Sequence, residues 1–538
     1  MGTVEAYPIL SYWHSTKPIY SCQFNHQEKN DNKFLTCGGD NKIKIWRFKK
    51  EPSQEEELKK ENPEHENNNN NVSKNSIGDI TSNIKTHFQK AKDRINDIEY
   101  ITTLKGFSKP VNISKFSKCG KYIAGCGDDG YVIIWEKIPT FVIDNFKKEY
   151  TEKLKNDTSL QNQFNSLSND IDKLMNPYNF PINFMMDSDI DEYEDEYSSV
   201  DDIKELYRII KYFPVTSLSS NDQVEIYSLD WSPDSNYLII GYMNTYIKII
   251  DIHDSQQPYL IAKKNHNDVV QGCSWDPKNE MIITMSADRS ICIYKPKFNN
   301  QKKLQDIKLV NRIVKGEMNL LGKQESIFAQ VDFNFFRKLQ FSPDGNLLVL
   351  PYGIWKNENN VEVNCVHIFH RANLLRGINK PIATIPNLKK RCLCVSFNPN
   401  YYQINSNNTV TSNLFLLPYK MIFAIATDDE IMIYDTDNLK CLMRIKNLHY
   451  YTIYDISWNA KGDKIIICSK DGFLSTIDLK NYKFGDLILE QEEENSNNND
   501  DADAMDVDIE IEDCKKNLET EIKQKQPTII NLLTVRKK

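Results

Sequence analysis

Histidine side chains can serve as general acids, general bases or metal ligands, and this chain repeats them at a fixed distance before an aromatic residue. The pairs, separated by nine or ten residues, are His14 with Phe24, His266 with Trp275 and His449 with Trp458. A single catalytic or metal centre uses its residues once, whereas these recur at equivalent places. We therefore interpret the three histidines as structural hydrogen-bonding residues.

Aspartates recur in a similar way, six residues before the end of a strand-like segment. The pairs are Asp40 with Trp46, Asp129 with Trp135, Asp288 with Tyr294, Asp428 with Tyr434 and Asp471 with Ile477. An aspartate just before a strand suits a tight turn, because its carboxylate accepts hydrogen bonds from nearby backbone N–H groups. A large aromatic residue at the strand end, such as Trp46 or Trp135, fills the space between neighbouring sheets. We predict structural roles for all of these residues.

Other chemistry-bearing residues show no pattern that is typical of an active site. The twelve cysteines form no CxxC pair, and Cys392 and Cys394 lie two residues apart in a strand-like segment. Alternate residues of a strand face the same side, so we interpret these two thiols as buried core groups. No P-loop, metal-ligand pair or nucleophile elbow is present in the sequence. We predict a protein that is not an enzyme, with no cofactor and no catalytic or metal-binding residue.

The elements that carry these residues also repeat. At seven places an apolar run ends in an aromatic residue and a turn follows, and these aromatics are Phe24, Phe116, Trp231, Trp275, Phe341, Phe397 and Trp458. Residues 42–46 and 290–294 are examples of the alternating or β-branched runs that indicate strands. Seven copies of a unit of roughly 40 residues predict one all-β repeat domain.

The combination of histidine, aspartate and aromatic positions resembles that of the WD-repeat β-propeller. Asn265-His266 and Leu448-His449 stand where such repeats begin, and Trp46-Arg47 stands where one ends. The resemblance implies a seven-bladed propeller with blades near residues 14–49, 103–137, 216–253, 259–297, 327–371, 381–437 and 440–479. We expect the segment from Val4 to Trp13 to supply the outer strand of the last blade, because closing the ring removes an exposed sheet edge.

Stretches of different composition interrupt and follow the blades. The domain boundaries that we expect are 1–49 for blade 1 with the ring-closing strand, 50–100 for an insertion, 101–137 for blade 2, 138–215 for a second insertion, 216–482 for blades 3–7 and 483–538 for a tail. The first insertion is rich in Asn, Glu and Lys and cannot bury a core, so we expect a disordered loop there.

The second insertion shows helical patterning. Apolar residues follow helical spacing at Ile143, Phe146, Tyr150 and Leu154, and again at Leu160, Phe164, Leu167, Ile171 and Leu174. This spacing predicts two amphipathic helices, and we expect an acidic tract and then a short helix from Ile203 to Ile210. The helices could cap the chain's own propeller or dock a partner, and the sequence leaves both interpretations open.

The net charge of −8 is distributed unevenly. Residues 187–202 contain nine acidic and no basic residues, and residues 490–513 contain twelve acidic and no basic residues, so the remainder of the chain is positively charged. Such acidic tracts are usually disordered and solvated, but they also suit a basic partner. No apolar run is long enough to span a membrane, and the N-terminus lacks a secretory pattern.

Several segments together resemble one family, the WD-repeat middle subunit of chromatin assembly factor 1. The segments that carry the resemblance are Trp13-His14, Pro18 to Ser21, Phe335 to Leu348, Leu417 to Ala426, Ile433 to Thr436 and His449 to Trp458. The resemblance spans residues 1–49, 101–137 and 216–482.

The resemblance implies a nuclear, non-enzymatic scaffold in a complex that deposits histones H3–H4 on newly replicated DNA. The partners that it implies are the large and small subunits of chromatin assembly factor 1, H3–H4 and a histone chaperone of the Asf-one type, with DNA reached only indirectly. A C-terminal β-prone, basic motif would bind the chaperone, and its candidate residues here are Ile529, Ile530, Asn531, Leu532, Leu533, Thr534, Arg536 and Lys537. This motif departs from the family pattern, because its basic residues follow the apolar core and no Arg pair precedes it.

Two alternatives remain open at the level of sequence. The WD-repeat subunit of a replication-independent histone regulator complex is related, but it usually carries a long second domain where this chain has only residues 483–538. Many propellers are substrate receptors of ubiquitin ligases, although no motif in this sequence favours that class. We interpret Lys389-Lys390-Arg391 as a solvated turn and not as a reader of a DNA groove.

Overall fold

The structure is a computed structural model of the whole chain. It describes residues 4–9, 14–27, 31–49, 97–156, 170–178, 180, 202–214, 224–254, 259–317, 324–330, 336–357, 359–404, 414–415 and 417–488. The chain divides into two units, Met1–Ile488 and Leu489–Lys538, and all described residues belong to the first. Four of the expected features lie largely or wholly outside the described residues: residues 50–96 of the loop expected at 50–100, residues 187–201 of the acidic tract at 187–202, the acidic tract at 490–513 and the C-terminal motif at 529–537.

Seven four-stranded antiparallel sheets form the first unit, and each is one blade. From the innermost strand outward, blade 1 is β2 (Ile19–Phe24), β3 (Lys33–Gly38), β4 (Ile43–Phe48) and β5 (Ile98–Leu104); blade 2 is β6 (Val111–Phe116), β7 (Tyr122–Gly127), β8 (Tyr131–Lys137) and β9 (Tyr207–Pro214); blade 3 is β10 (Ile226–Trp231), β11 (Tyr237–Tyr242), β12 (Tyr246–Asp251) and β13 (Ile261–Lys264).

The remaining blades continue the same order. Blade 4 is β14 (Val270–Trp275), β15 (Ile282–Ser286), β16 (Ile291–Phe298) and β17 (Leu304–Ile313); blade 5 is β20 (Gln340–Phe341), β21 (Leu347–Lys356), β22 (Glu362–His370) and β23 (Ala383–Leu388); blade 6 is β24 (Cys392–Tyr402), β25 (Lys420–Thr427), β26 (Glu430–Asp435) and β27 (Cys441–Lys446); blade 7 is β28 (Ile453–Trp458), β29 (Lys464–Ser469), β30 (Leu474–Asp478) and β1 (Glu5–Ile9). A short hairpin of β18 (Lys315–Glu317) and β19 (Gln324–Ser326) lies between blades 4 and 5.

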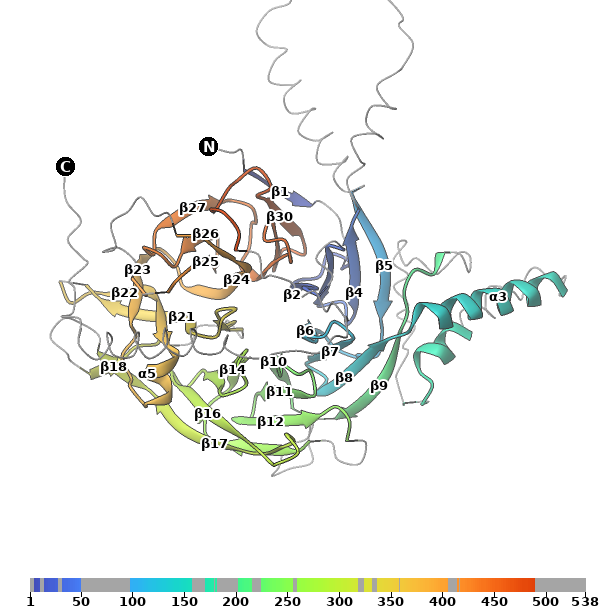
Figure 1. Cartoon of the computed structure of the whole chain (residues 1–538), viewed down its shortest axis with the longest axis horizontal. Coiled ribbons are helices and arrows are strands. Elements are labelled where there is room, and N and C mark those ends of the chain that lie inside the picture. The colour runs from blue at the N-terminus through green and yellow to red at the C-terminus, as the bar shows by residue number, and fades with distance from the viewer. Residues whose placement is uncertain are drawn as a thin grey trace, which may run out of the picture. The chain divides into compact units, whose positions relative to one another are not determined.

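The blades form a closed ring, because each innermost strand contacts the innermost strand of the next blade and β28 contacts β2 (Figure 1). The seven-bladed WD-repeat propeller expected from the sequence is therefore confirmed. The ring is joined at blade 7, where β1 pairs antiparallel with β30 and places Glu5 opposite Asp478. This is the position at which the sequence placed a ring-closing outer strand.

Apolar residues on both faces of the strands explain why the sheets stack as blades. The strands Ile226–Trp231, Tyr237–Tyr242 and Lys464–Ser469 are buried at every position, as expected for sheets that are covered on both sides. Trp135, Trp231 and Trp458 are fully buried and fill the wide space between neighbouring sheets. The core therefore consists of apolar layers between consecutive blades.

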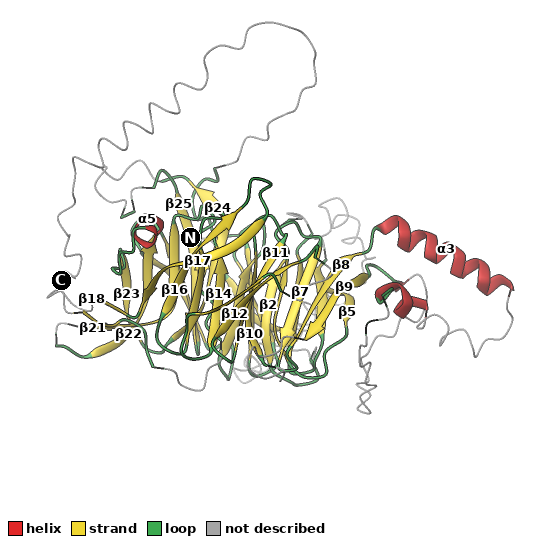
Figure 2. Cartoon of the chain, turned by 90° about the horizontal axis from the view of Figure 1, so that it is seen from below, coloured by secondary structure: helices red, strands yellow, loops and turns green. Residues whose placement is uncertain are grey.

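Two faces of the ring follow from the strand directions. We call the entry face the side on which each innermost strand begins, and the turn face the side on which it ends with the aromatic residue and its turn. The helix α5 (Arg371–Leu375) lies on the turn face, because Arg371 bonds Asp276 and the carbonyl oxygen of Gly345 in two of these turns. Figure 2 shows α5 and the start of α3 on this side of the strands.

The expected helix from Ile203 to Ile210 is wrong. Residues 207–214 form β9, which pairs with β8 as the outer strand of blade 2. Ile203, Leu206 and Ile210 have helical spacing, but a free edge of β8 is available and pairing satisfies its backbone groups. The outer strand β5 of blade 1 lies at residues 98–104, which were expected to fall partly in the disordered loop and partly in blade 2. The outer strands β13, β23 and β27 likewise belong to blades 3, 5 and 6, although their residues fall in the ranges expected for blades 4, 6 and 7.

The insertion between β8 and β9 contains the expected first helix, α3 (Thr140–Asn156), and residues 170–175 are also helical. Ile143 and Tyr150 of α3 pack with Ile171, Ile203 and Leu206 in a small separate core. Figure 1 shows α3 extending outward from blade 2. The described part of the insertion therefore does not cover the propeller as a cap. No helix among the described residues is long and apolar enough to span a membrane.

Candidate functional site

The first network of residues singled out from the sequence lies in blade 1. It joins the loop before β2 to the strands β3 and β4. His14 Nε2 lies 2.8 Å from Thr36 Oγ1, and Trp46 Nε1 donates to the same hydroxyl at 2.9 Å. His14 Nδ1 lies 2.7 Å from Asp40 Oδ1. His14 is completely buried, so its ring contacts protein groups and not solvent. These contacts support a structural role for the histidine.

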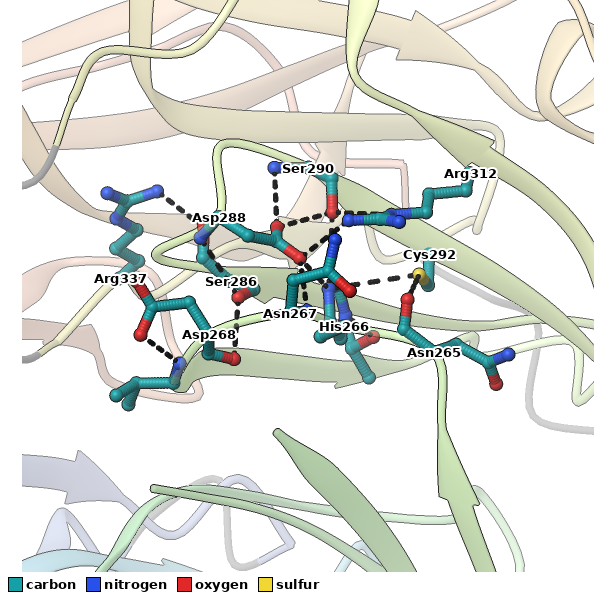
Figure 3. A network of polar contacts seen from close by, with 12 residues as sticks. Asn265, His266, Asn267, Asp268, Ser286, Asp288, Ser290, Cys292, Arg312 and Arg337 are labelled. Atoms are coloured by element: carbon teal, nitrogen blue, oxygen red, sulfur yellow. Dashed lines mark hydrogen bonds and ion pairs between the residues drawn. The ribbon is translucent and has the colours of Figure 1, made fainter. Parts of the chain in front are cut away.

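Blade 4 contains a larger version of this network (Figure 3). His266 Nε2 lies 2.7 Å from Thr284 Oγ1 and its Nδ1 lies 3.3 Å from Asp288 Oδ2. Asp288 also accepts hydrogen bonds from the backbone N–H of Asn267 at 2.8 Å and from Arg312 Nη2 at 2.8 Å. Burial favours the neutral acid, but the hydrogen bonds outweigh it, and the pKa of Asp288 lies well below its ordinary value.

The other blades keep only parts of the network. His449 Nδ1 lies 3.0 Å from Asp471 Oδ2 in blade 7. Asp129 of blade 2 accepts from the backbone N–H groups of Ser108 and Tyr131, both at 3.0 Å. Trp135 is buried beside it, and the backbone carbonyl of Asp428 in blade 6 accepts from Ile453 at 3.1 Å. Within the part of the chain that the structure describes, no three His, Cys, Asp or Glu residues are grouped to hold a metal ion.

A second cluster, which sequence reasoning missed, lies where the innermost strands begin. Six of these strands have a register shift near their second residue, and these residues are Tyr20, Asn112, Tyr227, Gln271, Leu393 and Tyr454. A bulge turns its extra residue away from the ladder. The bulges therefore turn one side chain of each of these six blades out of its ladder on the entry face, and the tyrosines among them gather around the mouth of the central channel.

Aromatic rings from four blades contact one another where the innermost strands begin. The ring centroid of Phe336 lies 5.5 Å from that of Tyr20, 5.6 Å from that of Tyr454 and 6.3 Å from that of Tyr227. Tyr20 and Tyr454 are 5.6 Å apart. Tyr20, Tyr227 and Tyr454 belong to blades 1, 3 and 7, while Phe336 precedes the first strand of blade 5. Phe336 thus contacts blades on opposite sides of the ring.

A buried ion pair reinforces the same junction. Lys338 Nζ lies 2.6 Å from Asp455 Oδ2 and donates to the carbonyl oxygen of Tyr20 at 3.0 Å. Ser21 Oγ and the backbone N–H of Cys22 donate to Asp455 Oδ2 at 2.8 and 3.1 Å. Burial lowers the pKa of Lys338, but the neighbouring Asp455 carboxylate outweighs it and the net pKa is raised. Blades 5, 7 and 1 are joined by this pair.

The segment that precedes β28 presents two tyrosines outside the channel. Tyr450 is 95% exposed and Tyr451 is 62% exposed. Their backbone is held in place, because the N–H of Tyr450 donates to Asp471 Oδ2 at 3.2 Å and Ser469 Oγ donates to the carbonyl of Tyr451 at 3.1 Å. The entry face therefore combines a closed aromatic channel mouth with a fixed, exposed tyrosine pair.

Two known families match parts of this chain. Residues 7–47 and 98–136 match the WD domain, G-beta repeat. Residues 195–484, more than half of the chain, match the CAF1B/HIR1 beta-propeller domain. The chain belongs to the CAF1B/HIR1 beta-propeller family. The family match contains Phe336, Lys338, Tyr454 and Asp455, so most of the channel-mouth cluster lies within it.

Relatives in this family cover most of the chain. A chromatin assembly factor 1 subunit of Saccharomyces cerevisiae is 28% identical over 484 residues, which cover 88% of this chain and 86% of that protein. The protein of the same name from Schizosaccharomyces pombe is 28% identical over 537 residues and covers 87% and 85%. Protein HIR2 of Debaryomyces hansenii is 24% identical over 268 residues, which cover 49% of this chain and 24% of that protein. The resemblance to the WD-repeat subunit of chromatin assembly factor 1 is therefore confirmed.

Proposed function

We propose that this chain is a non-enzymatic scaffold subunit of a chromatin assembly complex in the nucleus. In this role it joins the large and small subunits and supports deposition of histones H3–H4 on newly replicated DNA. The observation that carries the proposal is the extent of similarity, because 88% of the chain aligns with 86% of the chromatin assembly factor 1 subunit from Saccharomyces cerevisiae.

The alternative is a subunit of a replication-independent histone regulator complex. Similarity to HIR2 extends over 49% of this chain and only 24% of that protein, whereas similarity to the chromatin assembly factor 1 subunit from Saccharomyces cerevisiae extends over 88% and 86%. This difference in coverage favours the chromatin assembly factor 1 role. A ubiquitin-ligase substrate receptor is a third candidate class, and no described residue favours it.

The framework suits a scaffold. The buried network of His14 fixes the loop and strands within blade 1, and the ion pair of Lys338 and Asp455 joins different blades. A fixed ring presents loops from several blades without the ordering cost that a flexible binder incurs on association. The repeated histidines and aspartates stabilise the blades. We therefore expect partners to bind the loops that the blades expose.

The C-terminal motif is the proposed contact with an H3–H4 chaperone. Residues 529–537 combine a β-prone apolar run with basic residues, which suits addition of a strand to the edge of another protein's sheet. Deleting residues 527–538 is expected to weaken chaperone binding and to leave large-subunit binding unchanged. Equal loss of both partners would contradict the assignment of this motif.

Affinity purification of the tagged full chain from nuclear extract tests the main proposal. Mass spectrometry is expected to recover a large subunit, a small subunit and histones H3–H4. Recovery of histone regulator subunits would favour the alternative within the family, and recovery of a cullin adaptor would favour the ligase class. Recovery of neither histones nor a large subunit contradicts the scaffold role.

A further inference from the structure

Exposed lysines flank the tyrosine pair on the entry face. We define the tyrosine–lysine arc as six exposed residues in loops of four consecutive blades, and they are Lys389 of blade 6, Tyr450, Tyr451 and Lys470 of blade 7, Lys17 of blade 1 and Lys109 of blade 2. Each loop precedes an innermost strand, except that Lys470 lies in the hairpin between β29 and β30. The arc follows the ring over more than half of its blades.

None of the four lysines of the arc forms an ion pair with a described residue, although Lys109 is close enough to Asp128 and Asp129 for its charge to act on these carboxylates. Lys390, next to Lys389, differs because its Nζ lies 3.3 Å from Asp429 Oδ2. The positive charges of these four lysines repel one another weakly and create a positive field along the loops. An anionic ligand would relieve that repulsion.

The centre of the arc is rigid although its side chains are exposed. The N–H of Lys470 donates to the carbonyl of Thr452 at 3.0 Å, which joins the β29–β30 hairpin to the tyrosine loop. Gly472 follows in the same hairpin with φ +81°, and a Cβ there would lie 2.8 Å from the carbonyl oxygen of Lys17. This close approach packs blade 7 against blade 1, so the backbones that carry the tyrosine pair, Lys470 and Lys17 lie against one another.

An exposed tyrosine whose backbone is already ordered is well suited to binding a partner. Tyrosine is enriched among residues that dominate binding energy, because it buries a large ring and offers a hydroxyl at low entropy cost. Tyr450 and Tyr451 bury little of their rings in the chain itself. Their hydroxyls can donate to carboxylates while their rings cover an apolar side chain, and the flanking lysines add charge complementarity.

We propose that the tyrosine–lysine arc docks an extended acidic segment of a partner protein, with an apolar residue of that segment packed on Tyr450 and Tyr451. The entry face also presents carboxylates at both ends of the arc. Asp429 is exposed and pairs with Lys390 at the blade 6 end, and Asp128 is half-buried near Lys109 at the blade 2 end. A continuous phosphate backbone would be repelled there, whereas a peptide can place neutral residues opposite them. The observations therefore favour a peptide over a nucleic acid, and this inference holds independently of the proposed complex.

Fluorescence anisotropy with the full chain tests the proposal. The probe is a labelled 16-residue peptide of Glu, Asp and Gly with two central Leu residues, and a single-stranded thymidine 16-mer is the nucleic-acid comparison. The test variants are Tyr450→Ala/Tyr451→Ala and Lys17→Glu/Lys470→Glu. The matched control is Lys118→Glu/Lys461→Glu, which reverses two exposed lysines on the turn face of blades 2 and 7.

We expect the wild-type chain to bind the peptide with an affinity that falls as salt is raised, because exposed charges are screened. Each test variant should weaken binding at least tenfold, while the control pair stays within twofold. Thermal melting of all variants is measured alongside, and unchanged midpoints assign the losses to the surface.

Three outcomes would overturn the proposal. They are absence of peptide binding by the wild type at low salt, equal losses in the control pair and the Lys17/Lys470 pair, and tighter binding of the thymidine strand with the same dependence on Tyr450 and Tyr451. The last outcome would assign the arc to nucleic acid.

Discussion

A buried neutral histidine makes the stability of blade 5 dependent on pH. His367 is completely buried, with Nε2 3.0 Å from the carbonyl oxygen of Ile327 and Nδ1 3.0 Å from Thr384 Oγ1. Burial lowers its pKa to about 4. Between pH 6.5 and 4 the unfolded chain therefore binds a proton that the folded chain does not, so stability is lost as pH falls through this window. At about 1.4 kcal/mol per pKa unit the loss approaches roughly 3 kcal/mol.

The prediction is checked by thermal melting at pH 7.5 and pH 4.5. His367→Gln is expected to lower the midpoint at pH 7.5 and to reduce the difference between the two pH values. His253, which is exposed, supplies the control, and His253→Gln should leave the pH dependence unchanged. An unchanged pH dependence in His367→Gln would show that other groups control acid stability, such as His26, whose ring bonds the carbonyl oxygen of Trp458 and whose pKa is also lowered.

The His14 network is structural, so we expect its removal to lower the stability of the fold and to leave partner binding intact. His14→Ala removes the ring that bonds both the Asp40 carboxylate and the Thr36 hydroxyl, at a cost of about 2 kcal/mol. These two groups keep the backbone N–H of Lys42 and the indole N–H of Trp46 as hydrogen-bond donors. The thermal midpoint should fall, and partner recovery below that midpoint should remain normal. Ser108→Ala, an exposed change in the corresponding loop of blade 2, should have no effect. Normal stability with lost partner binding would instead make His14 part of an interaction site.

The contacts of some residues could be predicted from the sequence, and those of others could not. The histidine and aspartate pairs were predictable, because each network forms within one repeat and its spacing is local. Tyr20, Tyr227 and Tyr454 also have a regular position, four residues before Phe24, Trp231 and Trp458. Their meeting with Phe336 depends on closure of the ring, and no local spacing encodes that.

At the scale of elements, the insertion between β8 and β9 is anchored through charge. Glu205 Oε1 lies 2.8 Å from the fully buried Lys33 Nζ and 2.9 Å from Arg47 Nη2, which places blade 1 against the segment before β9. Burial raises the pKa of Glu205, but Lys33, Lys137 and Arg47 outweigh it and lower the net pKa. The sequence suggested a helix here because its apolar spacing is ambiguous, whereas the observed strand depends on pairing with β8.

Breaking this anchor should destabilise the fold strongly. Glu205→Ala leaves Lys33 with fewer charge partners in a buried position, and removal of one member of a buried pair costs about 3 kcal/mol. Denaturant unfolding of the variant is compared with that of Glu152→Ala, an exposed change on α3 that should stay within about 0.5 kcal/mol of the wild type. A similar small effect of both changes would mean that the anchor contributes little.

At the scale of the whole molecule, the ring was the most predictable feature. The aromatic–turn phrases are local signals, and in blades 2, 3, 4, 5 and 7 a turn to the next strand follows the aromatic residue. Blade 6 differs from the expectation, because β24 continues past Phe397 through a register shift. The turns also link neighbouring blades, as where Tyr419 Oη donates to Asp344 Oδ2 at 2.7 Å and Asn398 Nδ2 donates to the carbonyl of Gly462 at 2.9 Å. These side chains were visible in the sequence, but their partners were not, because each partner belongs to a different repeat.

Ring closure by β1 gives the last prediction. Removing residues 2–13 deletes β1 and exposes the edge of β30, along with apolar surface that Ile9 covers. Several backbone hydrogen bonds are lost at about 1 kcal/mol each, and a free strand edge promotes pairing between chains. The thermal midpoint should fall and light scattering should detect oligomers, whereas removing only residues 2–3 should change neither. A synthetic peptide of residues 1–13 should restore the midpoint, and a stable monomer without β1 would contradict the importance of this closure.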